Sequence, residues 1–385
     1  MLKRRKTLIR LGTLICVLGI LASALAIPSG AATFRDESDA KSLILIEAKT
    51  GRVLFERDAD LTLPPASVTK VMTMLLVMEA IDSGVIKYDD MVTVSETAAS
   101  MGGSQVFLEP GEQMSVHEML KCVVVSSAND ACVALAEHIA GSEASFVDRM
   151  NAKAAELGMT HTCFENTNGL DDTTVNHMTS ARDIATMSAE LITKHPKILE
   201  YSSIWMDSIR NGEFGLTNTN RLIRFYSGAN GLKTGSTSKA KFCISASAKR
   251  GDMQLICVVM GASTRDSRNE VAKKMFDFGF ANYAYEEFPS STLESINVVG
   301  GKEDSVPLAY GDFGTVVDKA DAGKTEQKIN LPQSVKAPIK AGDVIGNIQY
   351  TLNGEVISEV PIVAVTGTEK VTFWDIFKAM IGSMA

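Results

Sequence analysis

The sequence predicts an α+β fold in which strands from both ends of one domain enclose a helical middle. Two short apolar runs, 42–47 and 52–56, flank a Lys-Thr-Gly turn and are typical of a hairpin. Two longer apolar runs, 241–249 and 253–261, meet at an Arg-Gly-Asp turn and indicate a second hairpin. Because strands occur early and late with helices between them, we expect one sheet assembled from both pairs.

Helical patterns fill the segment between the two expected hairpins. Apolar residues recur at helical spacing over 68–83, 116–140, 143–157 and 181–193, and a further helix is expected over 267–283. The chain has 385 residues, more than the ~100–200 of one typical domain, so we expect two domains. Its 45% hydrophobic and 22% charged residues are the composition of a globular protein.

The pattern changes in the last quarter of the chain to short alternating strands separated by glycine turns. The Asn353-Gly354 pair between two such runs is a strong hairpin signal. We therefore expect a first domain over residues 33–286 and a small all-β domain over residues 287–367.

The last residues, 368–385, are expected to form an amphipathic helix that associates with a membrane. An apolar stripe with Trp and Phe suits a helix lying in the membrane interface, and this one is too short to span a bilayer. The alternative is a helix packed on the all-β domain. The stripe consists of Phe373, Trp374, Ile376, Phe377, Met380, Ile381 and Met384.

The N-terminus has the pattern of a secretory signal peptide over residues 1–32. A cluster of Lys and Arg precedes an apolar run, and small residues allow cleavage near Ala26 or Ala32; a retained membrane anchor is the alternative. Removing residues 1–26 takes away five basic and no acidic residues, so the net charge moves from -8 to -13. This acidic balance argues against nucleic acid as a partner. We expect an extracytoplasmic protein, peripherally attached to the outer face of the cytoplasmic membrane.

Cysteine and histidine patterns indicate neither a redox motif nor a metal site. The cysteines that follow the signal peptide include no C-x-x-C pair. Cys243 and Cys257 could face each other across a hairpin, but buried free thiols are the simpler interpretation. The five histidines form no H-E-x-x-H motif, and G-x-S-x-G is absent. We expect no metal and no cofactor.

The strongest chemical signal is Ser67 followed by Lys70 at the start of a predicted helix. Residues three apart share one helix face, with ~5–6 Å between Cβ atoms, so the amine can reach the hydroxyl. A lysine can serve as a base when burial and a neighbouring cation lower its pKa. The helix N-terminus adds positive potential where an oxyanion would form. The pair therefore predicts acyl transfer with Ser67 as the nucleophile.

The S-x-x-K pattern alone is not specific, because it recurs three more times in this chain and K-T-G occurs twice. Only one ordered set has the right context, and that order is the signature of penicillin-binding proteins and class A β-lactamases. The set is Ser67 with Lys70 at a helix start, Ser127-Ala128-Asn129 beside helical apolar residues, and Lys233-Thr234-Gly235 leading into a strand.

The flanking residues resemble those of D-alanyl-D-alanine carboxypeptidases, the low-molecular-mass penicillin-binding proteins. The resemblance covers nearly the whole chain after the signal peptide. It implies a β-lactamase/transpeptidase-like domain, with an antiparallel sheet flanked by helices and a helical subdomain, followed by a small β-sandwich domain. The segments that carry it are 65–73, 127–131, 164–170, 231–235 and 337–343.

The resemblance also implies a reaction. Ser67 would attack the carbonyl between the two D-alanines of a peptidoglycan stem pentapeptide, and Lys70 would take its proton. Ser127 would relay a proton to the departing D-alanine. The backbone N–H groups of Ser67 and Ser236 would stabilise the oxyanion, and water would hydrolyse the acyl-enzyme.

Substrate binding is implied for the remaining residues of the set. Asn129 would hold the catalytic lysine and the substrate backbone, and Lys233 with Thr234 would bind the terminal carboxylate. Gly235 and Ser236 would be substrate-binding residues as well.

Two alternatives remain open beside the carboxypeptidase. A β-lactamase shares the fold and motifs, but its E-x-x-L-N element is absent and Glu165 is only the nearest candidate. A non-catalytic penicillin-binding wall scaffold would keep the pocket without turnover. The preferred interpretation predicts stem peptides as partners and β-lactam antibiotics as covalent inhibitors. A rim loop at 102–104 and Arg221 are weaker candidates outside the catalytic set.

Overall fold

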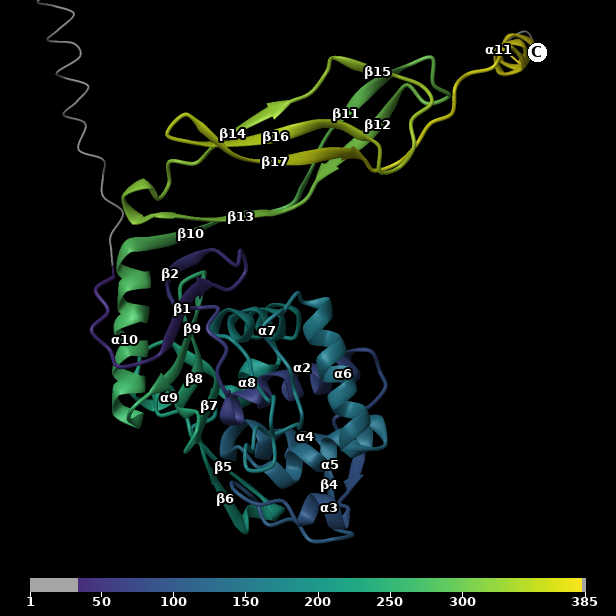
Figure 1. Ribbon diagram of the computed structural model, residues 1–385. Helices are drawn as coiled ribbons and strands as arrows, with labels where there is room; N and C mark the ends of the chain where they lie inside the picture. Colours follow the sequence, from purple (N-terminus) through teal and green to yellow (C-terminus); the bar gives the residue numbers. More distant parts are fainter. Residues whose placement is uncertain (1–33, 383–385) are drawn as a thin grey trace, which may run out of the picture. The chain divides into compact units, whose positions relative to one another are not determined.

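The computed structural model describes residues 34–382, and the predicted α+β fold is confirmed (Figure 1). The expected signal peptide, residues 1–32, and the last residues, 383–385, lie outside the described residues. The described chain begins with a sheet covered by helices and continues into an all-β part.

The main sheet has five antiparallel strands in the order β2-β1-β9-β8-β7. It joins the early hairpin to the late one, as the sequence predicted. Lys233-Thr234-Gly235 lies inside the edge strand β7 and does not precede a strand, because β7 already begins at Ala229. The strands are β1 (Ser42–Glu47), β2 (Val53–Arg57), β7 (Ala229–Thr237), β8 (Lys241–Arg250) and β9 (Met253–Ala262).

Helices cover both faces of this sheet (Figure 1). On one face α10 (Arg265–Asn282) packs against β8 and β9, and a Cβ at Gly279 would meet Leu255 Cδ1 at 2.6 Å. On the other face α7 (Ala181–Lys194) packs against β1 and β9, and α2 (Lys70–Asp82) packs on α7. Because both faces are covered, β9 is buried along its whole length.

The prediction of one continuous helix over 116–140 is wrong, because the helix is interrupted before Asn129. After α4 (Val116–Lys121) comes a π-helical turn, Cys122–Ser126; Ser127 then has a φ of 63°, and α5 (Asn129–Ala140) starts afresh. The turn contains three consecutive valines, which are stiff and weak helix formers, followed by two serines that compete for backbone hydrogen bonds. The interruption takes Ser127 out of any helix.

The predicted all-β part is confirmed, and its hairpin lies where the Asn-Gly pair indicates. β16 (Val344–Leu352) and β17 (Glu355–Ala364) are joined by Asn353 and Gly354, whose φ angles are 52° and 84°. Both residues are left-handed, as a type I′ turn requires.

This part contains a six-stranded sheet in the order β14-β16-β17-β12-β11-β15 and a separate pair, β10 with β13. Phe288 and Phe313 from the pair pack on Tyr350 of the larger sheet, with 4.3 Å between the Phe313 and Tyr350 ring centroids. These rings join the two sheets around one core. The strands are β10 (Tyr283–Phe288), β11 (Ser291–Val299), β12 (Ser305–Tyr310), β13 (Phe313–Asp318), β14 (Glu326–Asn330) and β15 (Ser334–Lys336).

The last described element, α11 (Phe373–Gly382), exposes large apolar side chains to solvent. Phe373 is 72% exposed and Trp374 is 66% exposed. Within residues 34–382, none of the helices combines the length and apolar character that crossing a bilayer needs.

Cys243 and Cys257 are buried free thiols, which agrees with the preferred interpretation. Cys257 lies opposite Ala246 in the β8–β9 ladder, so the two cysteines do not face each other. The remaining α-helices and strands of the described residues are α3 (Glu96–Ala99), α6 (Glu143–Glu156), α8 (Ile198–Ser202), α9 (Leu222–Phe225), β3 (Met91–Thr93), β4 (Gln113–Ser115), β5 (Met206–Ile209) and β6 (Phe214–Thr217).

Candidate active site

The structure brings Ser67 and Lys70 together at the start of α2. Ser67 lies in a 3-10 turn, Ala66–Thr69, and Lys70 is the first residue of the following α-helix. Lys70 Nζ lies 3.0 Å from Ser67 Oγ, which is hydrogen-bonding distance. Ala66 precedes the serine with a φ of 49°, a left-handed conformation that costs a residue other than glycine about 1–3 kcal/mol. Ser67, the expected nucleophile, therefore lies on a strained turn.

Lys70 is fully buried and is oriented by two acceptors. Its Nζ lies 2.6 Å from Asn129 Oδ1 and 2.8 Å from the backbone oxygen of Asn168. A neutral amine has two N–H donors and one lone pair. Because these two oxygens can only accept, they take the N–H donors and leave the lone pair for the hydroxyl proton of Ser67.

Burial lowers the pKa of Lys70 from 10.5 to about 8, although Cys132 and Asp130 act in the opposite direction. The carboxylate of Asp130 is itself held by backbone N–H groups of Val106 and Leu108. A pKa near 8 makes a useful fraction of the amine neutral close to physiological pH. The arrangement can therefore deprotonate Ser67 without a histidine.

Ser127 and Asn129 reach the site because of the interrupted helix. Ser127 is buried and lines the same cleft as the nucleophile. Asn129 donates from Nδ2 to the oxygen of Gly102 at 2.7 Å, and its backbone N–H donates to the oxygen of Ser104 at 2.7 Å. With its amide nitrogen held in this way, the side-chain oxygen of Asn129 is free to face Lys70.

The edge strand β7 contributes Thr234, Gly235 and Ser236 to the cleft, whereas Lys233 on the same strand is fully buried and is not part of the lining. A Cβ at Gly235 would lie 2.8 Å from the backbone nitrogen of Ser67, so only glycine lets the strand approach the nucleophile this closely. Thr234 and Ser236 line the cleft. This approach places the backbone of β7 beside the N–H of Ser67, where an oxyanion hole would form.

Lys233 is a second fully buried lysine. Its Nζ donates to the oxygen of Thr234 at 2.9 Å, and within residues 34–382 no carboxylate lies within ion-pair distance of it. Burial and the charge of Lys70 hold the pKa of Lys233 well below its ordinary value. An anion bound nearby would restore the charged form.

The cleft has a volume of about 440 Å³, enough for the end of a small peptide.

Sequence reasoning missed Arg268, which lines the cleft although only 2% of its surface is exposed. Burial lowers the pKa of Arg268 to about 10, and its guanidinium donates to Asn269 Oδ1 and to the oxygen of Cys243. It lies in the first turn of α10 among several charged residues, so the sequence carried no signal for it.

Further polar and aromatic residues line the cleft. Ser104 and Arg221, the weaker sequence candidates, are among them, and no acidic side chain is found among the described residues of the lining. The cleft is therefore cationic in an acidic protein. The complete lining is Ser67, Ser104, Ser127, Trp205, Thr217, Asn218, Thr219, Arg221, Thr234, Gly235, Ser236, Arg265 and Arg268.

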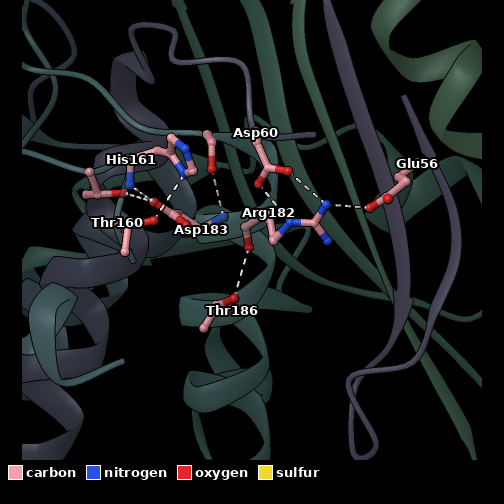
Figure 2. A network of polar contacts seen from close by, with 9 residues as sticks. Glu56, Asp60, Thr160, His161, Arg182, Asp183 and Thr186 are labelled. Carbon is pink, nitrogen blue, oxygen red and sulfur yellow. Dashed lines mark hydrogen bonds and ion pairs between the residues drawn. The ribbon is translucent and has the colours of Figure 1, made fainter. Parts of the chain in front are cut away.

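A polar network ties the segment before the nucleophile to the N-terminus of α7 (Figure 2). Arg182 donates to Asp60 Oδ1 and to Glu56 Oε2, each at 2.7 Å. The neighbouring Asp183 accepts from the backbone N–H of His161 at 2.9 Å. The Arg182 contacts hold the segment 56–60 against α7. Over residues 34–382, no group of three or more His, Cys, Asp or Glu could hold a metal ion.

The comparisons with known proteins agree with this geometry. The sequence profile of the D-alanyl-D-alanine carboxypeptidases matches residues 29–264, and that of the penicillin-binding protein 5 C-terminal domain matches residues 289–370. The chain belongs to the D-alanyl-D-alanine carboxypeptidase family. The resemblance stated from the sequence motifs is thereby confirmed.

Relatives in this carboxypeptidase family cover almost the full chain. D-alanyl-D-alanine carboxypeptidase DacF of Bacillus subtilis is 43% identical over 377 residues, which is 96% of each chain. DacC of Escherichia coli is 37% identical over 354 residues, covering 88% of this chain and 87% of that one. Penicillin binding protein 5 from Haemophilus influenzae matches in structure with a TM-score of 0.76 and 31% identity, over 88% of this chain and 100% of that one.

One structural neighbour within the carboxypeptidase fold was solved with an antibiotic bound. Penicillin-binding protein D2 from Listeria monocytogenes, in its ampicillin-bound form, has a TM-score of 0.59 and 30% identity. The match covers 64% of this chain and all of that one. These likenesses confirm the expected penicillin-binding protein fold, with a peptidase domain followed by an all-β domain.

Proposed function

We propose that this chain is a serine-type D-Ala-D-Ala carboxypeptidase that removes the terminal D-alanine from peptidoglycan stem pentapeptides. The observation that carries the proposal is the 3.0 Å contact between Ser67 Oγ and a buried Lys70 whose pKa burial lowers to about 8. Membership of the carboxypeptidase family supplies the substrate class.

In the proposed acylation step, Ser67 attacks the carbonyl carbon of the penultimate D-alanine while its proton moves to Lys70. The oxyanion is stabilised by the backbone N–H groups of Ser67 and Ser236, which the approach of β7 supports. The C–N bond then breaks, and Ser127 relays the proton held by Lys70 to the departing amine, so that Lys70 is neutral again. Water hydrolyses the resulting ester and frees Ser67 again.

The substrate carboxylate is assigned to the cationic end of the cleft. Lys233 and Thr234 bind it in this proposal, and the buried guanidinium of Arg268 adds positive charge on the same wall. Asn129 keeps the base oriented and faces the substrate backbone. Gly235 contributes by having no side chain, because the strand must lie close to the nucleophile.

A β-lactamase is disfavoured because the deacylating glutamate has no counterpart in the cleft. Glu165, the nearest candidate, accepts from the backbone N–H groups of Val175 and Asn176 and is not part of the lining. We therefore expect benzylpenicillin to leave a long-lived penicilloyl adduct on Ser67.

Mass spectrometry of the intact protein after exposure to benzylpenicillin tests the nucleophile. Wild type should gain one adduct, located by peptide mapping to Ser67, and Ser67→Ala should gain none. Ser238→Ala is the matched control, because Ser238 belongs to another S-x-x-K match and is exposed. An adduct that persists in Ser67→Ala would refute the assignment.

Release of free D-alanine from a pentapeptide ending in D-Ala-D-Ala tests turnover. The carboxypeptidase should release one D-alanine per peptide, and Ser67→Ala should release none. A protein that forms the penicilloyl adduct but releases no D-alanine would instead be a wall-binding scaffold, and rapid hydrolysis of benzylpenicillin would indicate a β-lactamase.

The proposal also covers location and domain limits. We place the protein outside the cytoplasm after removal of a signal peptide over residues 1–32, with a catalytic domain over 33–286 and a β-sandwich domain over 287–367. The exposed apolar side chains of α11 support attachment of residues 368–385 to the membrane surface.

Sedimentation with anionic lipid vesicles tests the attachment. Full-length protein should sediment, whereas a protein ending at Gly367 should stay in the supernatant. Replacing Phe373, Trp374 and Phe377 by serine keeps the length constant and should also abolish sedimentation. Equal sedimentation of all three proteins would refute the membrane role.

A further inference from the structure

His177 is a buried, titratable residue that the proposed reaction does not use. It is 3% exposed, and its two ring nitrogens have different partners. The backbone N–H of Glu165 donates to Nδ1 at 2.9 Å, so Nδ1 must be unprotonated. The proton of the neutral ring is therefore on Nε2, which lies 2.7 Å from Thr69 Oγ1 and donates to it. The two contacts fix one tautomer of the ring.

Thr69 links His177 to the turn that contains Ser67. Its hydroxyl accepts from His177 and donates to the backbone oxygen of Ala66 at 2.8 Å. Ala66 is the left-handed residue immediately before Ser67. Two successive hydrogen bonds, from His177 to Thr69 and from Thr69 to Ala66, thus stabilise the left-handed conformation of Ala66, which is unfavourable on its own.

The segment 164–179 that carries His177 also contacts the base and the turn directly. The backbone oxygen of Asn168 accepts from Lys70 Nζ at 2.8 Å. Gly169 packs against the same Ala66 oxygen, because a Cβ at this glycine would lie 1.9 Å from it. One segment therefore holds both the base and the residue before the nucleophile.

We propose that neutral His177 is a positioning residue that acts through Thr69, holding the Ala66 carbonyl so that Ser67 Oγ stays within reach of Lys70. This inference rests on the proposed function, since it assigns His177 a part in forming the acyl-enzyme. His177 does not touch the reacting atoms.

The charge state of the ring agrees with this role. Burial lowers the pKa of His177 to about 4, although the nearby carboxylates of Glu165 and Asp171 favour the charged form. Phe164 covers the ring edge-on with 5.8 Å between centroids. The ring is therefore neutral throughout the range in which Lys70 titrates, and it keeps its single donor toward Thr69.

Two amide substitutions separate the two contacts of the ring. In His177→Gln the side-chain amide reaches the Nε2 position and can still donate to Thr69. In His177→Asn the shorter amide can accept from the N–H of Glu165 but leaves Thr69 without a donor. Both remove the ring that packs on Phe164, so each serves as the packing control for the other.

The measurement is stopped-flow acylation by a fluorescent penicillin, which separates the dissociation constant of the first complex from the acylation rate constant. We expect His177→Asn to lower the acylation rate constant at least tenfold with little change in the dissociation constant. His177→Gln should stay within about threefold of wild type. Equal losses in both variants, or no loss in His177→Asn, would overturn the inference.

Substitutions at Thr69 test the same pair of hydrogen bonds at their second residue, and they remain informative if His177→Asn does not fold. Thr69→Ser keeps the hydroxyl and should acylate at nearly the wild-type rate, whereas Thr69→Val should lose at least tenfold. In the double variant of His177→Asn with Thr69→Val we expect no further loss, because both changes interrupt the same pair of hydrogen bonds. Fully additive losses of acylation rate in the double variant, or equal acylation rates for Thr69→Ser and Thr69→Val, would contradict the positioning role of His177.

Failure of this inference is distinguishable from failure of the proposed function. If wild type forms the Ser67 adduct and His177→Asn forms it equally fast, only the positioning role is lost. If wild type forms no adduct at all, the proposed function fails.

Discussion

Raising the pH from 6 to 8 is expected to accelerate acylation of Ser67 by about fiftyfold. Attack requires neutral Lys70, whose pKa burial lowers to about 8. At that pKa the neutral fraction is about 1% at pH 6, about 9% at pH 7 and about 50% at pH 8, since each pH unit below the pKa is a tenfold change. Above pH 9 the amine is almost fully neutral, so the rate should level off. The second-order rate constant should therefore rise with unit slope and bend near pH 8.

The assay is stopped-flow fluorescence with a fluorescent penicillin between pH 5.5 and 9.5 at constant ionic strength. Ser67→Ala provides the blank, and near-ultraviolet circular dichroism at each pH shows that the fold is intact. A rate that is constant over this range would refute Lys70 as the base. A half-maximal rate near pH 6.5 would do so as well, because it would indicate a histidine.

The same pKa change has a consequence for stability. The pKa of Lys70 is lower in the folded chain than the 10.5 of an exposed lysine, so folding disfavours the charged form. The cost is fully present below about pH 8 and disappears as the pH rises through 10.5; it amounts to roughly 3 kcal/mol. The difference in unfolding free energy between wild type and Lys70→Met should therefore change by about this amount over that range, in favour of wild type at high pH. No change in this difference would mean that Lys70 is not desolvated.

Three further substitutions follow from the packing and charges around the site. Gly169→Ala should lower the free energy of unfolding in urea by at least about 2 kcal/mol, because the new Cβ would lie 1.9 Å from a backbone oxygen. Gly158 also has a left-handed backbone but has open space around it, so the control Gly158→Ala should cost only about 1 kcal/mol. Asn129→Asp should place a carboxylate 2.6 Å from Lys70, raise the pKa of that lysine and slow acylation at pH 7 at least tenfold, and an unchanged pH profile would contradict this. Arg182→Ala removes ion pairs from a side chain that is 37% exposed, so the free energy of unfolding should fall by only about 1 kcal/mol. This loss should be smaller in 0.5 M salt, and the acylation rate should not change.

Most of the sheet could be predicted from the sequence because its central strands are largely apolar runs. β1 and β9 are buried throughout and β8 is buried along its middle, so local composition reports their environment, whereas β2 is mostly exposed or half-buried. The Asn353-Gly354 turn was equally clear, because only residues that tolerate positive φ fit a type I′ hairpin. In these cases local chemistry and the final environment agree.

The interruption at Ser127 could not be predicted from periodicity. Residues 116–140 are apolar enough to continue as one helix, and α4 and α5 are both helical. The valines and serines weaken the helix locally, but its interruption at this point also depends on tertiary contacts, since Asn129 bonds to Gly102 and Ser104 while Ser127 lines the cleft. Motif order located these residues, but only the structure explains why their backbone leaves the helix.

Contacts made by backbone atoms were beyond the reach of the sequence altogether. The Asn168 oxygen that binds Lys70 could belong to any residue type, so no residue identity marks it. Arg268 was missed for a different reason. Its helix carries many charges, and nothing local separates a buried arginine from exposed ones. Such residues are recognised only when the fold brings them to the same cleft.

The charges of the cleft give a reason why the base acts when substrate is bound. Lys233 and Arg268 are buried, and within residues 34–382 neither has a carboxylate within ion-pair distance. In the proposed binding mode, a bound terminal carboxylate would supply the missing negative charge and favour the ammonium form of Lys233. Because Lys70 and Lys233 repel each other when both are charged, a charged Lys233 in turn favours the neutral form of Lys70. Under the proposed mechanism, substrate binding and activation of Ser67 would thus be coupled through one electrostatic relation, and a ligand without the carboxylate would lose affinity and reactivity together.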